Sequence, residues 1–302
     1  MAGHVRGMCV AGRVARAFLE RTINQLTGRR TRRYSLAPVA TPKVLICRPD
    51  NPVDRVTIHA IEDIRPAAVA LHEIVMSLVR LRTAASANIA SKEPMVDAQG
   101  RILASTVFGW TGPPPTWWEN PRLALTSPLT IACRYESEPF WCNAQGIHVR
   151  QHNPHLDALD LGDFMKRAMT GAAIVVPIHM PFGQIGAVSF NPIEPDRVDL
   201  SQEFEQYSEQ FESYARRFIL SYVKVMSKRR WVEPDVRLSK REVQCLHWAA
   251  LGKTDEEIAT IMSLSAATIQ FHLRNAAAKL NAVNRCQTVY KATQLGYLGL
   301  GF

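Results

Sequence analysis

The chain has 302 residues, of which 47% are hydrophobic and 21% are charged. This composition can supply packed cores and argues against global disorder, and the length predicts about two domains. No run approaches the ~18 consecutive apolar residues that a membrane-spanning helix needs, so we expect a cytoplasmic protein without a membrane partner.

The cysteines and histidines do not form a pattern typical of a metal or redox site. The six cysteines are scattered, without a CxxC pair or a histidine at metal-ligand spacing, so we expect reduced thiols and no metal. His148, His152 and His155 share a loop with Asp157, but their irregular spacing favours a solvated loop over a metal site.

The net charge of +9 is concentrated at the two ends of the sequence. Residues 1–43 hold nine basic residues against one acidic residue, residues 237–302 hold eight against four, and the stretch between them is net negative. A basic C-terminal module on a mildly acidic body suits a protein that delivers one end to a polyanion. We expect residues 1–54 to be a disordered basic extension or the product of a start codon placed too far upstream; the alternative is an arm that touches DNA phosphates.

Residues 55–226 alternate between helical and extended patterns and predict one domain of both helices and strands. Apolar residues recur at helical spacing over residues 65–82. Residues 172–179 and 184–190 have the pattern of two strands, and the turn residues Met180-Pro-Phe-Gly183 between them predict a hairpin.

A long amphipathic helix is expected over residues 201–226. Its aromatic stripe packs on the sheet of its own domain or forms a dimer seam. Residues 227–236 break the pattern, and Pro234 indicates a linker to a second domain, residues 237–302.

The second domain begins with two helices that carry strong start signals. Ser239 with Glu242, and Thr254 with Glu257, each have the spacing of a capping box. A tight Ser-Leu-Ser turn then leads into a third helix, and a polar cap precedes a fourth. We therefore expect an all-α, four-helix domain of the helix-turn-helix type.

The third helix, from about Ala266 to Leu280, has an inward and an outward face. One apolar stripe must pack against the other helices, and it consists of Ile269, Leu273, Ala276 and Leu280. The outward face carries the predicted DNA base contacts, which are Thr268, Gln270, Phe271 and Arg274. Glutamine can pair with adenine, arginine with guanine, and an aromatic ring can contact a thymine methyl group.

Four further residues are predicted to contact DNA phosphates without reading sequence: Lys253, Thr254, Arg285 and Thr288. The last two lie on the expected fourth helix, Asn284 to Leu298. Tyr290 and Tyr297 on that helix are placed to meet a partner subunit.

The motif Leu238-Ser-Lys-Arg-Glu, followed by Gly252-Lys-Thr, Glu257-Ile-Ala and Ser265-Ala-Ala-Thr-Ile-Gln-Phe-His-Leu-Arg, resembles the output domain of the LuxR family of bacterial regulators. The resemblance runs over residues 237–300 without an insertion. It implies that the third helix is the recognition helix and that the last helix helps to pair two subunits.

Residues 171–190, and the segment from Ser127 to Trp141, resemble the autoinducer-binding domain of the same family. This resemblance implies an α/β/α sandwich on an antiparallel sheet, with a pocket between sheet and helices, so the expected fold class is α+β. The implied ligand is an acyl-homoserine lactone or a related small signal, and no other cofactor is expected.

The expected ligand-binding residues depart from the family pattern. Ser127, before Pro128, stands where the family has an aspartate, and a hydroxyl cannot supply a charge-assisted hydrogen bond. Trp141 matches a ligand-binding tryptophan, although its spacing from Pro128 is one residue short, and Ala173 replaces a glycine. Trp117 and Trp118 are alternative matches to the pocket's aromatic wall, and core packing remains the other interpretation of Trp118 and Trp141.

These patterns predict a dimeric, sequence-specific transcriptional regulator rather than an enzyme, tuned by a small signal whose lactone recognition is altered. Its expected partners are double-stranded DNA, a second copy of the chain and RNA polymerase. The alternative is a regulator that binds no ligand and is controlled by a protein partner.

Overall fold

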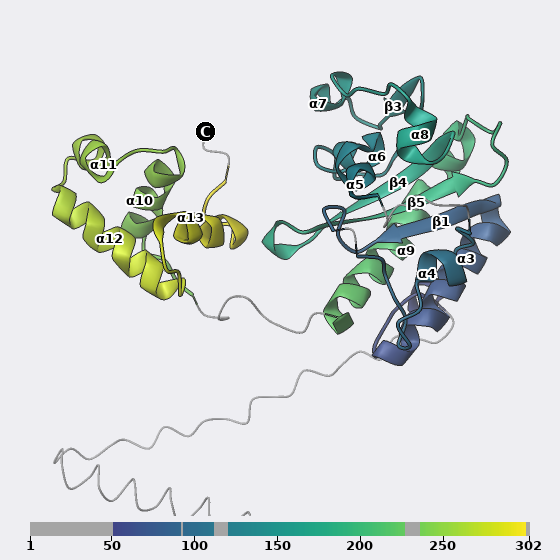
Figure 1. Cartoon of the computed structure of the whole chain (residues 1–302), viewed down its shortest axis with the longest axis horizontal. Helices are drawn as coiled ribbons and strands as arrows, with labels where there is room; N and C mark the ends of the chain where they lie inside the picture. The colour runs from purple at the N-terminus through teal and green to yellow at the C-terminus, as the bar shows by residue number, and fades with distance from the viewer. Residues whose placement is uncertain (1–50, 92, 112–119, 227–235, 300–302) are drawn as a thin grey trace, which may run out of the picture. The chain divides into compact units, whose positions relative to one another are not determined.

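The computed structural model describes residues 51–91, 93–111, 120–226 and 236–299 (Figure 1). The predicted 1–54 extension, the 227–236 linker, and Trp117 and Trp118 fall wholly or mostly outside these ranges. The helices of the N-terminal domain are α2 (Pro52–Arg55), η1 (Ile61–Asp63), α3 (Ile64–Val79), α4 (Leu103–Thr106), α5 (Pro121–Thr126), α6 (Pro128–Ala132), α7 (Pro154–Asp157), α8 (Phe164–Ala168), η2 (Pro181–Gly183) and α9 (Ser201–Met226). None of the helices in the described ranges is both long and apolar enough to cross a bilayer.

The N-terminal domain is built on one antiparallel sheet of five strands in the order β1-β5-β4-β2-β3. The strands are β1 (Leu81–Ser86), β2 (Phe140–Asn143), β3 (Gly146–His148), β4 (Ala172–His179) and β5 (Ile185–Pro192). Helices α3 and α9 pack on one face of the sheet, and α6, α7 and α8 pack on the other (Figure 1). The α+β class and the layered sandwich expected from the sequence are confirmed.

Alternating side chains of the central strand β4 divide the interior into two cores. Ile174 and Val176 enter the core of α3 and α9, whereas Ala173 and Val175 enter the core on the opposite face. Every residue of β4 except His179 is buried, because β4 is covered on both faces.

The predicted β4–β5 hairpin is confirmed. The connection is the three-residue η2, in which Phe182 and Gly183 both have positive φ and reverse the direction of the chain. The first predicted helix ends three residues earlier than expected, because Arg80 adopts a left-handed conformation and Leu81 begins β1.

Helix α9 has the predicted bounds, and its aromatic stripe packs inside its own domain. Phe211 and Phe218 are fully buried, and Tyr222 donates its hydroxyl hydrogen to the carbonyl of Val96. The packing of α9 against β5 is close, because the side-chain Cγ2 of Ile219 lies only 2.8 Å from the place that a Cβ on Gly186 would take.

The C-terminal domain consists of α10 (Lys240–Ala250), α11 (Asp255–Met262), α12 (Ala266–Lys279) and α13 (Arg285–Gln294). Both predicted capping boxes are present, at Ser239 and at Thr254. The last helix ends at Gln294 rather than continuing to Leu298, because Gly296 takes up a left-handed conformation.

The close approach of α9 to the sheet predicts that Gly186→Ala destabilises the N-terminal domain. A Cβ at this position would lie 2.8 Å from the Ile219 methyl carbon and 3.1 Å from the carbonyl oxygen of Ser86. We expect the free energy of unfolding to fall by about 1–3 kcal/mol, the usual cost of overpacking. Thermal unfolding measures the loss, and Gly146→Ala, whose new Cβ would find its nearest neighbour at 3.5 Å, is the matched control. Equal stability of the two variants would contradict the prediction.

Candidate nucleic-acid interface and ligand cavity

Helix α12 separates an apolar face from an exposed face, as the sequence predicts. Ile269, Ala276 and Leu280 are buried and Leu273 packs against both cores of the domain. The helix therefore has a fixed rotation about its own axis, set by its apolar stripe.

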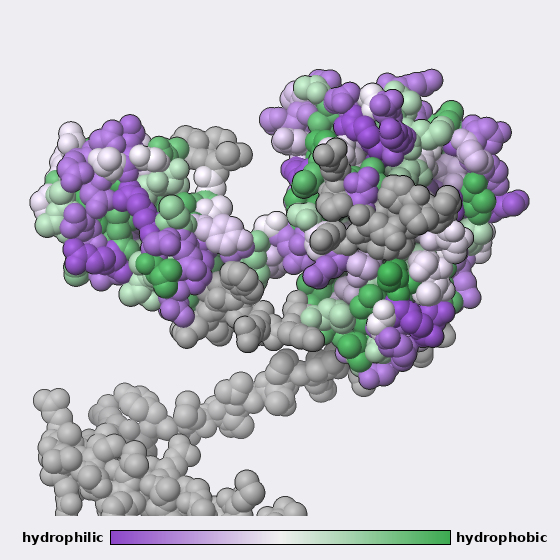
Figure 2. Space-filling view, viewed as in Figure 1, coloured by the Kyte–Doolittle hydropathy of each residue, from purple (hydrophilic) through white to green (hydrophobic). Residues whose placement is uncertain are grey.

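The exposed face of α12 presents the predicted base contacts to solvent. Gln270 and Arg274 are exposed, and the guanidinium of Arg274 donates to the side-chain oxygen of Gln270 at 3.3 Å. The Phe271 ring is 59% exposed beside them. Thr268 is half-buried, and its hydroxyl lies 2.8 Å from that of Ser265, the N-cap residue. In Figure 2 hydrophilic side chains cover much of the visible face of this domain.

The C-terminal end of α12 is held by two lysines. Lys279 donates to both carboxylate oxygens of Glu242 at 2.8 and 2.9 Å, and Glu242 also accepts from the backbone N–H of Ser239. Lys291 is buried and donates to the carbonyl oxygens of Leu280 and Asn281, which the helix itself leaves unpaired. Both contacts fix where α12 ends relative to α10 and α13.

The structure gives the predicted phosphate contacts different surroundings. Lys253 is half-buried and pairs loosely with Glu257, and Thr254 is exposed. Arg285 lies at the start of α13, where its guanidinium binds the carboxylate of Asp255 and the carbonyl oxygen of Lys253. It therefore joins the N-terminus of α13 to that of α11.

The prediction for Thr288 is wrong. Its side chain is 2% exposed and its hydroxyl donates to the carbonyl oxygen of Asn284 one turn earlier. Thr288 lies on the inward face of α13, so its side chain does not reach a phosphate. The polar character of threonine suggested the surface, but an internal hydrogen bond satisfies the hydroxyl instead.

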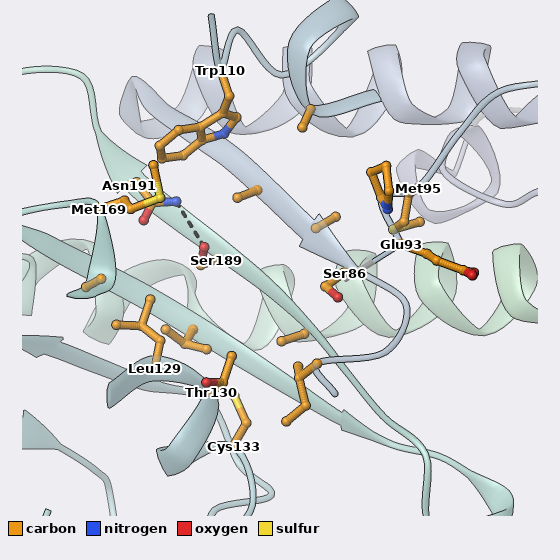
Figure 3. Close-up of a pocket in the computed structure, with 18 residues that line it drawn as sticks. Ser86, Glu93, Met95, Trp110, Leu129, Thr130, Cys133, Met169, Ser189 and Asn191 are labelled. Carbon is orange, nitrogen blue, oxygen red and sulfur yellow. Dashed lines mark hydrogen bonds between the residues drawn. The ribbon is translucent and has the colours of Figure 1, made fainter. Parts of the chain in front are cut away.

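A cavity of about 180 Å³ lies in the N-terminal domain on the sheet face that α6 and α8 cover (Figure 3). Its floor consists mainly of small side chains, Ala84 and Ser86 from β1 and Ala187 and Ser189 from β5. Larger groups that include Trp110, Leu129 and Met169 form its walls. These small residues lie at alternate positions of two paired strands and so face the same side of the sheet. Larger side chains at the same positions would fill the cavity.

Of the residues that the sequence assigned to a ligand, the four that the structure describes do not line this cavity. Ser127 and Ala173 are fully buried, and Pro128 is buried at the start of α6. The Ser127 hydroxyl oxygen has no hydrogen-bond partner among the residues that the structure describes. Ala173 lies on the cavity's face of the sheet, but it contributes to the packed core there.

Trp141 points to the opposite face of the sheet, which corrects its predicted role. It pairs across the sheet with Ile174 in the core of α3 and α9, and it stacks on His148 with ring centroids 3.9 Å apart. Phe140 occupies the cavity's face in its place. The spacing from Pro128 is one residue short, and a shift of one residue along a strand turns a side chain to the other face.

Sequence reasoning missed three residues that do line the cavity, Trp110, Ser189 and Asn191. Ser189 and Asn191 lie at alternate positions of β5, so the strand pattern places both on one face. The alternation of polar Ser189 and Asn191 around Phe190 was the available signal, although the predicted strand ended at residue 190. Trp110 precedes the segment where the aromatic wall was sought.

The four capped helices, with the third presented to solvent, form a helix-turn-helix domain. Residues 236–292 match the model of the bacterial regulatory proteins of the luxR family, so the C-terminal domain belongs to that family. The resemblance identified from the sequence is confirmed for this domain.

Curated relatives include the transcriptional activator protein VanR of Vibrio anguillarum, 37% identical over 127 residues, which are 42% of this chain and 52% of VanR. The transcriptional activator protein LuxR of Aliivibrio fischeri is 34% identical over 120 residues, 40% of this chain and 47% of that protein. A quorum sensing-dependent transcriptional regulator, VjbR of Brucella abortus, is 49% identical over 63 residues, 21% of this chain and 24% of VjbR. The chain thus spans about half the length of the first two, and all three are named as regulators rather than enzymes. The VanR match exceeds the length of the C-terminal domain, so it extends upstream of it.

Two solved structures also resemble the chain. Escherichia coli SdiA is 21% identical with a TM-score of 0.33, covering 58% of this chain and 69% of that one. SdiA in complex with octanoyl-rac-glycerol is 18% identical with a TM-score of 0.34, covering 76% and 88%.

The Glu242–Lys279 pair predicts an acid-sensitive C-terminal domain. Burial alone would raise the pKa of Glu242, but hydrogen bonds from Lys279 and the Ser239 N–H hold the pKa below its usual value. A pKa lowered by folding stabilises the folded state above the unfolded pKa, and this stability is lost as pH falls through the folded value. We expect Glu242→Gln to cost about 1–3 kcal/mol at pH 7 and less as the pH falls below about 4.5.

Calorimetric unfolding of the full chain between pH 7 and pH 3 tests this pH dependence. Glu256→Gln, which removes an exposed carboxylate from α11, serves as the control and should leave the pH profile unchanged. A constant stability difference between the Glu242→Gln variant and the native chain at all pH values would show that the carboxylate contributes nothing through its charge.

Proposed function

We propose that the chain is a sequence-specific DNA-binding transcriptional regulator that acts as a homodimer in the cytoplasm. The observation that carries the proposal is the exposed face of α12, where Gln270, Phe271 and Arg274 stand together while the apolar stripe behind them is buried. An amide and a guanidinium match the donor and acceptor patterns of base edges, and an exposed ring suits a thymine methyl group. Exposure of the apolar Phe271 ring to water is unfavourable, so the exposed ring favours a binding partner at this face.

The remaining DNA contacts position the domain. Lys253 and Thr254 precede α11, whose backbone N–H groups and partial positive charge favour a phosphate. Arg285 contributes to DNA binding by holding the start of α11 against α13, through its contacts with Asp255 and the Lys253 carbonyl. Two such domains in a symmetric dimer would read an imperfect palindrome, and RNA polymerase would be the further partner.

The cavity of the N-terminal domain supports control by a small molecule over control by a protein partner alone. The names of the relatives suggest a quorum-sensing type of signal. The family aspartate is replaced by Ser127, whose hydroxyl lies outside the cavity wall. Loss of one charged hydrogen bond costs roughly 1.5–3 kcal/mol, or about ten- to a hundredfold in affinity. We therefore expect recognition of acyl-homoserine lactones to be altered or lost.

Base preference at the DNA tests the proposal. Binding sites are first selected from a random duplex library with the full chain, and we expect imperfect palindromes to be recovered. Arg274→Ala should then weaken binding to the selected site by about 1–3 kcal/mol and relax the preference at one position of each half-site.

The charge-matched control is Arg241→Ala, which removes an exposed arginine from α10. It should weaken binding to selected and scrambled DNA by the same small factor. Full base preference in Arg274→Ala, or identical behaviour of the two variants on both DNAs, would contradict the assignment of α12.

A further inference from the structure

The cavity has two polar ends joined by an apolar middle. Asn191 and Ser189 lie at one end beside Trp110 and Met169, and Glu93 lies at the other beside Met95 (Figure 3). Neither a lysine, an arginine nor a histidine is among the described residues that line it. Any ligand must therefore be mostly apolar and must place its own polar groups at these ends.

Hydrogen bonds fix the orientation of the Asn191 amide. Its side-chain nitrogen donates to the backbone carbonyl oxygen of Arg82 at 3.4 Å and to the hydroxyl oxygen of Ser189 at 3.0 Å. A carbonyl oxygen can only accept, so the amide nitrogen must face Arg82. Both N–H groups of Asn191 are thereby used, and this side chain, 2% exposed, has its carbonyl oxygen left as an acceptor.

Ser189 has the complementary role. Its oxygen accepts from Asn191, and no acceptor for its own hydroxyl hydrogen is found among the described residues. Two other polar groups of the wall are already engaged: the Trp110 indole N–H donates to the Thr83 carbonyl at 2.6 Å, and the Thr130 hydroxyl donates to the Ser127 carbonyl. The pair on β5 therefore offers one donor and one acceptor side by side.

Building on the sensor role assigned to this domain, we propose that the Ser189–Asn191 pair reads the ligand. The ligand is a compact, largely apolar molecule that carries a primary carboxamide or a lactam. Both groups present a C=O and an N–H on the same edge, so the C=O accepts from Ser189 while the N–H donates to Asn191. A trans secondary amide points these two groups in opposite directions and satisfies only one partner.

The chemistry of the pair also rejects a carboxylate. A carboxylate has no donor for the Asn191 oxygen, and it brings a negative charge to a wall whose described residues supply no cation. The cavity of about 180 Å³ suits a body of one small ring or a short branched chain.

Ligand-observed NMR with the full chain at pH 7 tests the proposal with two probes of equal shape, cyclohexanecarboxamide and cyclohexanecarboxylate. We expect saturable binding of the amide and binding of the carboxylate weaker by about tenfold or more. Equal binding of the two probes, or no saturable binding of the amide at millimolar concentration, would overturn the proposal. N-hexanoyl-homoserine lactone forms a third arm, and stronger binding than the amide that is insensitive to Asn191 would also overturn it.

Three variants connect the binding to the residues. Ser189→Ala and Asn191→Leu each remove one hydrogen bond and should weaken amide binding by about tenfold. Trp141→Phe, on the opposite face of the sheet, should leave it unchanged. Since Asn191→Leu also removes the bond to Arg82, thermal unfolding is measured for each variant, and Ser189→Ala, at a half-buried position, carries the test if Asn191→Leu unfolds. Unaltered amide affinity in Ser189→Ala would reject the pair as the reader.

The same protein samples are assayed for DNA binding. Binding to the selected site with no amide binding would reject the ligand class and leave the DNA-binding function standing. Amide binding with no preference for any duplex would do the reverse.

Discussion

The alternation of side chains along β4 and β5 is the constraint on which the N-terminal domain depends. Because consecutive residues point to opposite faces, Ile174, Val188 and Phe190 are committed to the core of α3 and α9. The residues between them must then face α6 and α8. There the strands carry Val175, Ala187 and Ser189, which are too small to fill the layer, and a cavity remains.

The C-terminal domain depends instead on its helix ends. Ser239, Thr254, Ser265 and Asn284 each accept from a backbone N–H near the start of their helix. Glu242 links one of these caps to Lys279, so the start of α10 and the end of α12 are held by a single carboxylate. This contact limits how far the exposed face of α12 can tilt while its apolar stripe stays packed.

Features with a local signal were predictable from the sequence. The capping boxes, the β4–β5 hairpin and α9 depend on residues within a few positions of one another, and all appear where the sequence placed them. The length of α13 was overestimated, since Gly296 ends it while the apolar spacing continues. The inward position of Thr288 depends on how α13 packs against α10, which no local pattern contains.

The residues that line the cavity were harder to predict because they depend on register between distant strands. Ser189 faces the cavity because it aligns with Val175 of β4 and Ala84 of β1, about a hundred residues earlier in the chain. Trp141 was assigned by resemblance, yet a single missing residue before β2 reverses its face. Resemblance identifies which residue types a family uses, whereas strand register decides which of them reach the cavity.

The same register explains how the cavity has a hydrogen-bond acceptor although a serine, Ser127, precedes Pro128 where the resemblance implies an aspartate. Ser127 precedes α6, on the helical side of the cavity, and in the described part of the chain its hydroxyl oxygen has no hydrogen-bond partner. Asn191 lies on the sheet, where its amide nitrogen donates to the Arg82 carbonyl oxygen. This hydrogen bond orients the amide so that its oxygen is left as an acceptor. An acceptor on a strand is fixed by the sheet's own hydrogen bonds, so it needs no movement of α6 to be in place. In the proposed mode of binding, recognition relies on the sheet rather than on the helical side of the cavity, and on a neutral acceptor rather than a charged one.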